Sequence, residues 1–373
     1  MRICIVGPSF GYGGANIIAA TIGKELAKKN EIYYYSYKFK DNYSDLPESN
    51  LFFSSKKENK LLGKLGKGLE MVVKREFTPS KYKKNEINDL FNIINQKKID
   101  IVILNSFIAV TIFAEKIKKN FPNVILIAWM HEAVEHSFGS LTKNYPTAFR
   151  KALEVVNQIV CLTKKDLEVF KKYNNNSIII YNPLQFISPQ KSNLEDPVIS
   201  FTTRLDINIK GLDYLMKIAK NIPDDWTIRV AANGRQDQIN KFNKLIEDNK
   251  VNEKINYVGA LQGEQLIKHY LESSIFISTS RIESFQLVLI EAMECGLPII
   301  SFSHSGGREV LEYGKFGILI KNYDVSAMAI EINRLIDNKN KRIDLQKKSI
   351  ERSKDFQLKK IVDEWIVLLE KWM

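Results

Sequence analysis

The chain has 373 residues, of which 45% are hydrophobic and 26% charged. This composition is typical of a folded globular protein and excludes a wholly disordered, fibrous or disulfide-scaffold chain. Its length predicts two domains, because single domains cluster at roughly 100–200 residues. The net charge of +12 is uneven: residues 1–190 hold 28 basic against 17 acidic side chains, and the rest is nearly balanced. The first half is therefore expected to meet a membrane surface, nucleic acid or an anionic substrate.

Three cysteines, Cys4, Cys161 and Cys295, lie far apart in apolar runs. Their spacing fits neither a zinc site nor a disulfide framework, so we expect a reducing cytoplasm. The apolar run at residues 124–130 is shorter than the roughly 20 residues of a membrane-spanning helix. No part of the chain is therefore expected to cross a bilayer.

Short apolar strands alternate with amphipathic helical stretches from end to end. The first half predicts strands at residues 2–6, 32–35, 101–104, 124–129, 159–162 and 178–181. The second half predicts strands at residues 198–203, 226–231, 255–258, 275–279, 298–302 and 317–320. Such alternation predicts α/β domains with parallel, doubly wound sheets of the Rossmann-like kind.

A stretch with three prolines and no regular period, residues 182–197, separates the two halves. It is the expected interdomain connection. The predicted organisation is an N-terminal domain at 1–182, a linker at 183–197, a C-terminal domain at 198–354 and a last helix at 355–373, with a cleft between the domains.

Two glutamates eight residues apart mark residues 281–296. Glu283 precedes a turn, and Glu291 lies on an apolar helix, where a charge is costly unless it meets a polar partner such as a ligand hydroxyl. The loop before this helix has free N–H groups that favour a phosphate. The alternative is a solvated turn residue and an exposed helix position.

Two cations follow the strand that ends near Thr203. Arg204 comes first, and Lys210 stands just before the next helix. The carboxyl ends of parallel strands are where α/β sheets bind ligands, and a guanidinium with an ammonium suits a diphosphate. The alternative is an exposed basic loop.

Together these segments resemble the family 4 retaining glycosyltransferases of the GT-B fold. The resemblance covers residues 198–325, with the family's motifs in its order. They are Arg204 with Lys210 and Gly211, residues 258–259, residues 277–280, Glu283 with Glu291, the AMECGLP run at 292–298 and the GGREV run at 306–310.

The resemblance implies a hexosyltransferase that takes a nucleotide sugar, with UDP-sugar as the favoured donor, and needs no metal or other cofactor. Arg204 and Lys210 would hold the diphosphate, Glu291 the ribose, and Glu283 the donor sugar. The base would lie near Gly234, Gly259 and Ala260. The sugar and phosphate would meet the segment made of Ser284, Phe285, Gln286, Leu287 and Val288. The first domain (1–182) would bind the acceptor and the second (198–354) the nucleotide sugar, and the last helix would pack back on the first domain.

The first half carries fewer signals. Gly13 and Gly14 follow the first strand but do not fit the dinucleotide pattern G-x-G-x-x-G, since Asn16 occupies the third glycine position. In the family such a turn approaches the donor diphosphate; the alternative is a structural turn. His131 follows a strand and resembles the family's histidine beside the donor sugar, although a strand-end histidine can also have no such role. The chain has no Asp-x-Asp motif.

Residues 56–84 hold ten basic and three acidic side chains. Their core, residues 60–76, gathers Leu and Val on one helical side, which is typical of a helix lying on an anionic bilayer. The alternative is that these leucines pack inside the domain.

The expected function is therefore transfer of a sugar to a glycan or lipid-linked acceptor in bacterial surface polysaccharide synthesis, such as lipopolysaccharide, O-antigen or capsule. The enzyme would be cytoplasmic and peripheral on the membrane, with no nucleic-acid partner. Two alternatives remain. A sugar-nucleotide epimerase of the same fold would return the labelled donor as an epimer. A basic membrane- or nucleic-acid-binding protein without catalysis would bind no sugar nucleotide.

Overall fold

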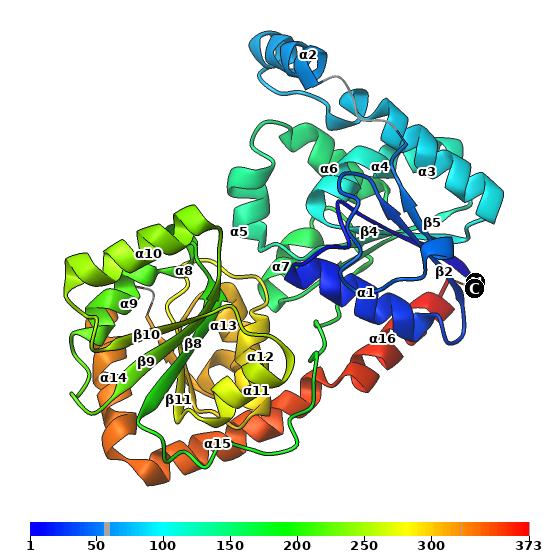
Figure 1. The fold of residues 1–373 in the computed structure, drawn as a ribbon. Helices are drawn as coiled ribbons and strands as arrows, with labels where there is room; N and C mark the ends of the chain where they lie inside the picture. The colour runs from blue at the N-terminus through cyan, green and yellow to red at the C-terminus, as the bar shows by residue number, and fades with distance from the viewer. Residues whose placement is uncertain (56–59, 322, 373) are drawn as a thin grey trace. The chain divides into compact units, whose positions relative to one another are not determined.

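The computed structural model describes residues 1–55, 60–321 and 323–372, with the backbone alone for 60–64. It divides into two compact units. The first unit contains Met1–Asn182 and Ile361–Met373, and the second contains Pro183–Lys360. The two units are two Rossmann-like α/β bodies, each with one parallel sheet (Figure 1).

The first unit has seven strands in the order β3-β2-β1-β4-β5-β6-β7. Its strands are β1 (Arg2–Gly7), β2 (Glu31–Ser36), β3 (Leu51–Phe53), β4 (Ile101–Asn105), β5 (Ile125–Trp129), β6 (Gln158–Cys161) and β7 (Ser177–Ile179). Its helices are α1 (Gly14–Leu26), α2 (Lys60–Lys74), α3 (Lys84–Lys97), α4 (Phe107–Asn120), α5 (Val134–His136), α6 (Pro146–Val155) and α7 (Lys164–Phe170). The strands β1 and β4 are fully buried runs of Ile, Val and Leu, as expected for a parallel sheet covered on both faces.

The second unit has six strands in the order β10-β9-β8-β11-β12-β13. They are β8 (Val198–Arg204), β9 (Thr227–Asn233), β10 (Ile255–Gly259), β11 (Ile275–Ser278), β12 (Ile299–Phe302) and β13 (Ile318–Ile320). The helices are α8 (Ile207–Lys210), α9 (Leu212–Ala219), α10 (Gln236–Asn249), α11 (Gly263–Leu271), α12 (Leu287–Glu294), α13 (Ser305–Val310), α14 (Val325–Asp337) and α15 (Lys339–Ser353). Helices α9, α10 and α14 share one core with the sheet, and α12 packs on α15.

The stretch expected as a free linker is part of the second unit. Ser188 N–H donates to Glu294 Oε1 at 3.2 Å, and the Lys191 ammonium lies 2.7 Å from the same oxygen. Leu194 is buried. The segment forms no strand, and its backbone N–H groups donate instead to the Glu294 side chain and to backbone carbonyls, such as Ser192 N–H to the Cys295 carbonyl at 2.8 Å.

The last helix begins later than residue 355. A short 3-10 turn at Lys354–Phe356 precedes α16 (Leu358–Glu370), and the chain enters the first unit at Ile361. There the fully buried Trp365 lies against Trp129, with ring centroids 4.6 Å apart.

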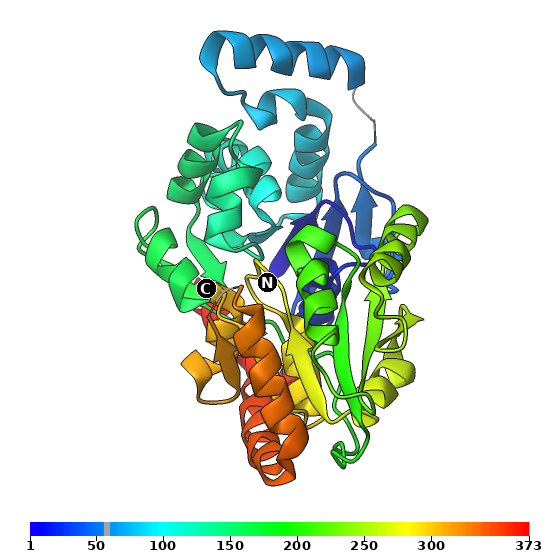
Figure 2. The ribbon, with the colours of Figure 1, turned by 90° about the vertical axis from the view of Figure 1, so that its left-hand side faces the viewer.

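Helix α2 stands clear of the layered body of the first unit, as Figure 1 and Figure 2 both show. Its inner side is polar: Glu70 accepts a hydrogen bond from the Tyr82 hydroxyl at 3.0 Å and pairs with Lys81. Its outer side exposes Leu65, Leu69, Val72 and Val73, each by 65–82%. These four side chains therefore do not pack inside the domain, whereas Met71 of the same helix is partly buried. The expected face also included Leu61 and Leu62, whose side chains lie outside the described residues.

Candidate functional site

The predicted donor-site residues of the second unit gather at one edge of its sheet. Strand order reverses between β8 and β11, because β9 and β10 extend to one side and β12 and β13 to the other. Arg204 ends β8, Lys210 follows it, and Glu283 follows β11. Ligands of open α/β sheets bind at such a reversal, outside the carboxyl ends of the strands.

Lys210 and Glu283, 73 positions apart in sequence, form an ion pair at this reversal. Both side chains are largely buried, 11% and 13% exposed. Burial by itself raises the pKa of the Glu283 carboxyl, but the Lys210 ammonium and His304 outweigh it, so the pKa lies below its usual range. The site therefore holds a carboxylate and an ammonium together, away from bulk water.

A third residue, Arg281, fixes the loop that carries Lys210. Its guanidinium makes a bidentate pair with Asp213, at 2.9 and 2.7 Å, and stacks 3.9 Å from the Tyr214 ring centroid. Its backbone N–H donates to the Ile209 carbonyl at 2.8 Å. Arg281 thereby ties the segment after β11, which carries Glu283, to the segment after β8, which carries Lys210.

Gly211 permits the close approach of the same two segments. It has a φ of 64°, and a Cβ at this position would lie 2.1 Å from the Thr279 carbonyl oxygen. Thr279 Oγ1 in turn donates to the Lys210 carbonyl at 2.8 Å. Any side chain at position 211 would push the two segments apart.

Helix α13 anchors the start of the segment expected to contact sugar and phosphate, residues 284–288. Ser305 Oγ and Gly306 N–H both donate to the Glu283 carbonyl, at 2.9 and 3.1 Å. Ser284 and Phe285 are buried, and the Gln286 amide turns inward, donating to Ser278 Oγ at 2.8 Å. Leu287 and Val288 form the first turn of α12, where N–H groups have no acceptor within the helix.

Glu291 lies one helical turn after Leu287, on the same face of α12. Burial raises the pKa of its carboxyl to about 7, and Tyr270 donates a hydrogen bond to its Oε2 at 3.0 Å. A buried carboxylate with one such hydrogen bond has remaining acceptor capacity, which suits a pair of ligand hydroxyls.

The other predicted residues line the same sheet edge. Arg204 ends β8 with an exposed side chain, and Gly234 follows β9 against Leu205. Gly259 ends β10, and the exposed Ala260 follows it. These residues lie at the edge where Lys210 and Glu283 meet, and no ion pair joins Arg204 to Glu283 in the described chain.

In the first unit, His131 follows β5 and is oriented by Asn105. The His131 Nε2 lies 2.6 Å from Asn105 Oδ1, which can only accept, so Nε2 carries the hydrogen. Burial lowers the pKa of His131 to about 3, so the ring is neutral, and its buried Nδ1 has no hydrogen-bond partner among the described residues. Trp129 packs on the ring, with centroids 4.8 Å apart. Gly13 and Gly14 begin α1 after β1.

Several positioning residues have weak sequence signals. Arg281 and Asp213 are ordinary charged residues until the fold brings them together, and Tyr270 and His304 lie in apolar or loop segments. Within residues 1–55, 60–321 and 323–372, no group of three or more His, Cys, Asp or Glu side chains could hold a metal ion. No helix in those ranges is long and apolar enough to cross a bilayer.

Comparison with known proteins gives the class of this fold and site. Residues 185–352 match the family described as glycosyl transferases group 1. An uncharacterized glycosyltransferase of Haemophilus influenzae is 28% identical over 251 residues, 65% of this chain and 69% of that protein. The structure of Anabaena HepE, solved with UDP and with UDP-glucose, has a TM-score of 0.77 and 17% identity over all of both chains.

A functionally named relative comes from Campylobacter jejuni. This GalNAc-alpha-(1->4)-GalNAc-alpha-(1->3)-diNAcBac-PP-undecaprenol alpha-1,4-N-acetyl-D-galactosaminyltransferase is 24% identical over 217 residues, 56% of this chain and 58% of that enzyme. The fold and family together define a glycosyltransferase of the GT-B class. The region that matches glycosyl transferases group 1, residues 185–352, makes up nearly all of the second unit.

Proposed function

We propose that this glycosyltransferase moves a sugar from a UDP-sugar to a hydroxyl of a glycan or lipid-linked acceptor in bacterial surface polysaccharide synthesis, with retention at the anomeric carbon. The observation that carries the proposal is the Lys210–Glu283 pair at the strand reversal of a group 1 domain. UDP and UDP-glucose complexes of the similar HepE structure support the choice of donor. The name of the Campylobacter relative, which acts on an undecaprenol-linked glycan, supports the acceptor class.

In this proposal the β-phosphate meets Lys210 and Arg204 as the glycosidic bond breaks. The two cations and the first N–H groups of α12 neutralise the charge that develops on the leaving diphosphate. Because the ammonium is already held in place, little reorganisation is needed when the donor enters. We propose that these groups make a metal ion unnecessary, so turnover should persist in EDTA.

The remaining residues would orient the substrates. While Lys210 also contacts the diphosphate, Glu283 would accept hydrogen bonds from hydroxyls of the donor sugar with its remaining lone pairs, and Glu291 would accept hydrogen bonds from the ribose hydroxyls. The unpartnered Nδ1 of His131 would accept a hydrogen bond from a sugar hydroxyl. The uracil would lie against the backbone at Gly234, Gly259 and Ala260.

The experiment is a titration of the protein with UDP, GDP and UDP-sugars in EDTA, followed by thermal unfolding. A ligand that binds only the folded protein raises its stability by RT ln(1 + [L]/Kd). We expect a shift with UDP that is lost in Arg204→Ala and Glu291→Ala, and transfer of label from the best UDP-sugar with the anomeric configuration kept by NMR. No shift with UDP, or return of the label as an epimer, would contradict the proposal.

We further propose that α2 docks the enzyme on the cytoplasmic face of an anionic membrane. Its outer face exposes Leu65, Leu69, Val72 and Val73, and the surrounding residues 56–84 carry ten basic against three acidic side chains. Apolar side chains flanked by cations bind anionic bilayers by burial and by charge together.

Sedimentation with phosphatidylglycerol vesicles tests this docking. Leu69→Glu and Val72→Glu should each reduce binding several-fold without lowering the thermal midpoint, because both side chains are at least 69% exposed. Ile330→Glu on α14 replaces a 54% exposed apolar residue of the second unit and is the control. Equal binding by all three variants would exclude α2 as the docking surface.

A further inference from the structure

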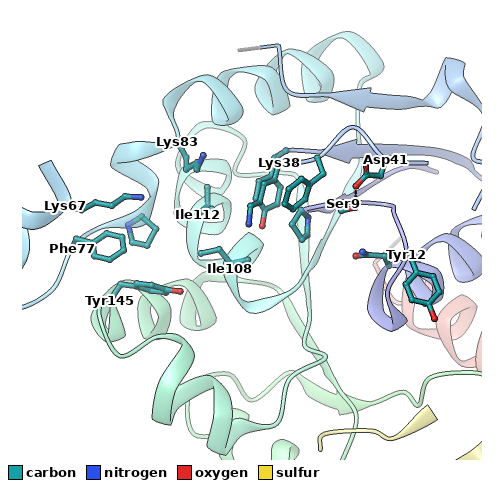
Figure 3. A pocket seen from close by; sticks show the side chains of 15 residues that line it. Ser9, Tyr12, Lys38, Asp41, Lys67, Phe77, Lys83, Ile108, Ile112 and Tyr145 are labelled. Atoms are coloured by element: carbon teal, nitrogen blue, oxygen red, sulfur yellow. Dashed lines mark hydrogen bonds between the residues drawn. The ribbon is translucent and has the colours of Figure 1, made fainter. Parts of the chain in front are cut away.

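A cavity of about 660 Å³ lies within the first unit, outside the donor site described above (Figure 3). It opens where the chain leaves β1 and β2. The first turns of α4, Lys67 of α2 and the segment that follows α2 form its other walls. This volume is within the roughly 300–1,000 Å³ of small-molecule sites and accommodates a sugar ring with a substituent.

The walls of the cavity are aromatic and aliphatic. Phe77 and Tyr145 lie edge to face, with centroids 5.2 Å apart, and Ile108 and Ile112 of α4 lie beside them. Aromatic rings combine a large apolar face with, in tyrosine, a polar tip. Such a wall suits the apolar C–H face of a sugar.

The polar lining is cationic. Lys38, Lys67 and Lys83 reach the cavity from three different segments, against Asp41 as the carboxylate of the lining (Figure 3). Lys83 pairs with Glu86, whereas Lys38 and Lys67 form no ion pair with any described residue and instead lie over aromatic rings. Two uncompensated ammonium groups in one cavity favour a ligand that carries negative charge.

One buried polar atom also lacks a partner. Tyr37 lines the cavity, its side chain is 4% exposed, and its hydroxyl makes no well-aligned hydrogen bond to a described residue, although the Ser106 side chain lies close enough to lower its pKa. Buried hydroxyls are nearly always satisfied, so this one indicates a ligand or a water in the cavity. Burial also raises the pKa of Tyr37, so its hydroxyl remains a hydrogen-bond donor at neutral pH.

The cavity and the exposed face of α2 share one helix. Lys67 reaches the cavity, and the outer side chains Leu65 and Leu69 lie on either side of it in sequence. A ligand whose polar head occupies the cavity could thus lead an apolar tail toward the face of α2.

We propose that this cavity is the acceptor site and that it takes a sugar ring bearing a phosphate, with Lys38 and Lys67 holding the phosphate and the Tyr37 hydroxyl donating to it or to the ring. The inference rests on the proposed transferase function. The same head chemistry occurs in a free sugar phosphate and in a prenyl diphosphate sugar, and the experiment separates the two.

The test is calorimetric titration of the full-length protein with saturating UDP, which occupies the donor site. The probes are four sugar 1-phosphates (of glucose, galactose and their N-acetylamino forms), the matching prenyl diphosphate sugars with a short chain, and the neutral sugars. We expect phosphate-bearing probes to bind at least tenfold more tightly than neutral sugars, because a hydrogen bond between an ammonium and a phosphate adds enough binding free energy for such a factor. Binding by both phosphate classes identifies the head alone as sufficient, and binding by the prenyl class alone identifies a lipid-linked acceptor.

Three substitutions locate the binding. Lys38→Gln and Lys67→Gln should each weaken it about tenfold. Tyr37→Phe should weaken it several-fold while leaving the thermal midpoint nearly unchanged, because the lost hydroxyl makes no well-aligned hydrogen bond to a described residue. Lys29→Gln, at the opposite end of β2, is the control for loss of one charge.

The outcomes separate this inference from the transferase proposal. If no phosphate-bearing probe binds, or if all three cavity variants bind as the wild type does, the cavity is not an acceptor site. The UDP-induced rise in thermal midpoint should be the same in every variant. Loss of UDP binding in the wild type itself would instead contradict the proposed function, and the probes would then report on the cavity alone.

Discussion

Lys210 and Glu283 neutralise each other in a site that must admit a diphosphate. The carboxylate keeps the buried ammonium oriented before the donor arrives, but it also competes with the donor for that ammonium. Because the site is largely shielded from water, two opposite charges in contact there attract each other by several kcal/mol, at an effective dielectric constant of about 20. The pair therefore couples apoprotein stability to the strength of donor binding.

Glu283→Gln separates these two effects. We expect the free protein to lose about 1–3 kcal/mol, because a buried ammonium loses its counter-charge. UDP should bind about tenfold more tightly, because a competing negative charge is gone. Turnover should fall, because the contact to the donor sugar is lost. Calorimetry measures the change in UDP affinity, and a transferase assay measures the change in turnover.

Glu294→Gln is the matched control, since Glu294 makes a buried pair with Lys191 at 2.7 Å in the same unit. It should lose similar stability with UDP affinity unchanged. If both variants bind UDP as the wild type does, Lys210 is not the phosphate ligand.

Glu291 adds a pH dependence of its own. Burial raises its pKa from 4.5 to about 7, so between these values the folded protein holds a proton that the unfolded chain has released. Stability from this residue therefore falls as pH rises through that window and stays low above it. Glu291→Gln cannot ionise, so it should match the wild type near pH 4.5 and exceed it by up to about 3 kcal/mol at pH 8.

Urea unfolding at the two pH values measures this difference, and the same variant should bind UDP more weakly. A constant offset between the two proteins across the pH range would mean that Glu291 does not titrate there.

At the scale of elements, the donor site depends on how closely the segments after β8 and β11 approach. Gly211→Ala puts a Cβ 2.1 Å from the Thr279 carbonyl oxygen at a φ of 64°, so we expect a loss of about 2–5 kcal/mol from strain and overlap together. Gly259→Ala is the control, with a φ of 77° and open space around the Cβ. It should cost only about 1–2 kcal/mol, from backbone conformation.

Thermal and urea unfolding of both variants measure their losses of stability. The difference between the two losses is the cost of the overlap between the Cβ at position 211 and the Thr279 carbonyl, because the backbone strain is common to both. UDP affinity should fall in Gly211→Ala because Lys210 moves with its loop. Equal destabilisation in the two variants would show that the segments relax without cost.

The central strands were predictable from sequence. A strand that is covered on both faces of a parallel sheet is a nearly continuous apolar run, as in β4 and β5, and that run is visible without knowing which helices cover it. The three-residue strand β3 was missed, since Leu51–Phe53 is too short to show a period. The family motifs predict the positions of Lys210 and Glu283 in sequence. The tie from Arg281 to Asp213 and the cavity around Lys38 need contacts between distant segments, which no local pattern contains.

The direction of α2 was also beyond the sequence. An apolar stripe predicts an amphipathic helix, but it does not say whether the stripe meets a core or a solvent-facing partner. The decisive contacts come from Glu70 and Gly66, which pack against Tyr82 and turn the apolar stripe outward.

On the scale of the whole molecule, the chain passes between its units twice, after Asn182 and after Lys360. The last residues, in helix α16, therefore belong to the same unit as the first strand, β1. Trp365 lies against Trp129, and Trp129 lies against His131. Helix α16 thus supports His131, a predicted substrate-binding residue of the first unit. In sequence, the whole second unit lies between the two.

Trp365→Ala should consequently destabilise the first unit and leave the second unchanged. Removing a fully buried indole costs about 3–5 kcal/mol. Hydrogen exchange should accelerate in β4 and β5 but not in β8 and β9, and turnover should fall through His131 while UDP affinity is retained. Trp365→Phe should recover most of the stability, and Val367→Ala, at a 68% exposed position of the same helix, should change neither unit. Faster exchange in β8 as well would mean that the two units unfold together, and unchanged exchange in β5 would mean that the helix contributes nothing to the first sheet.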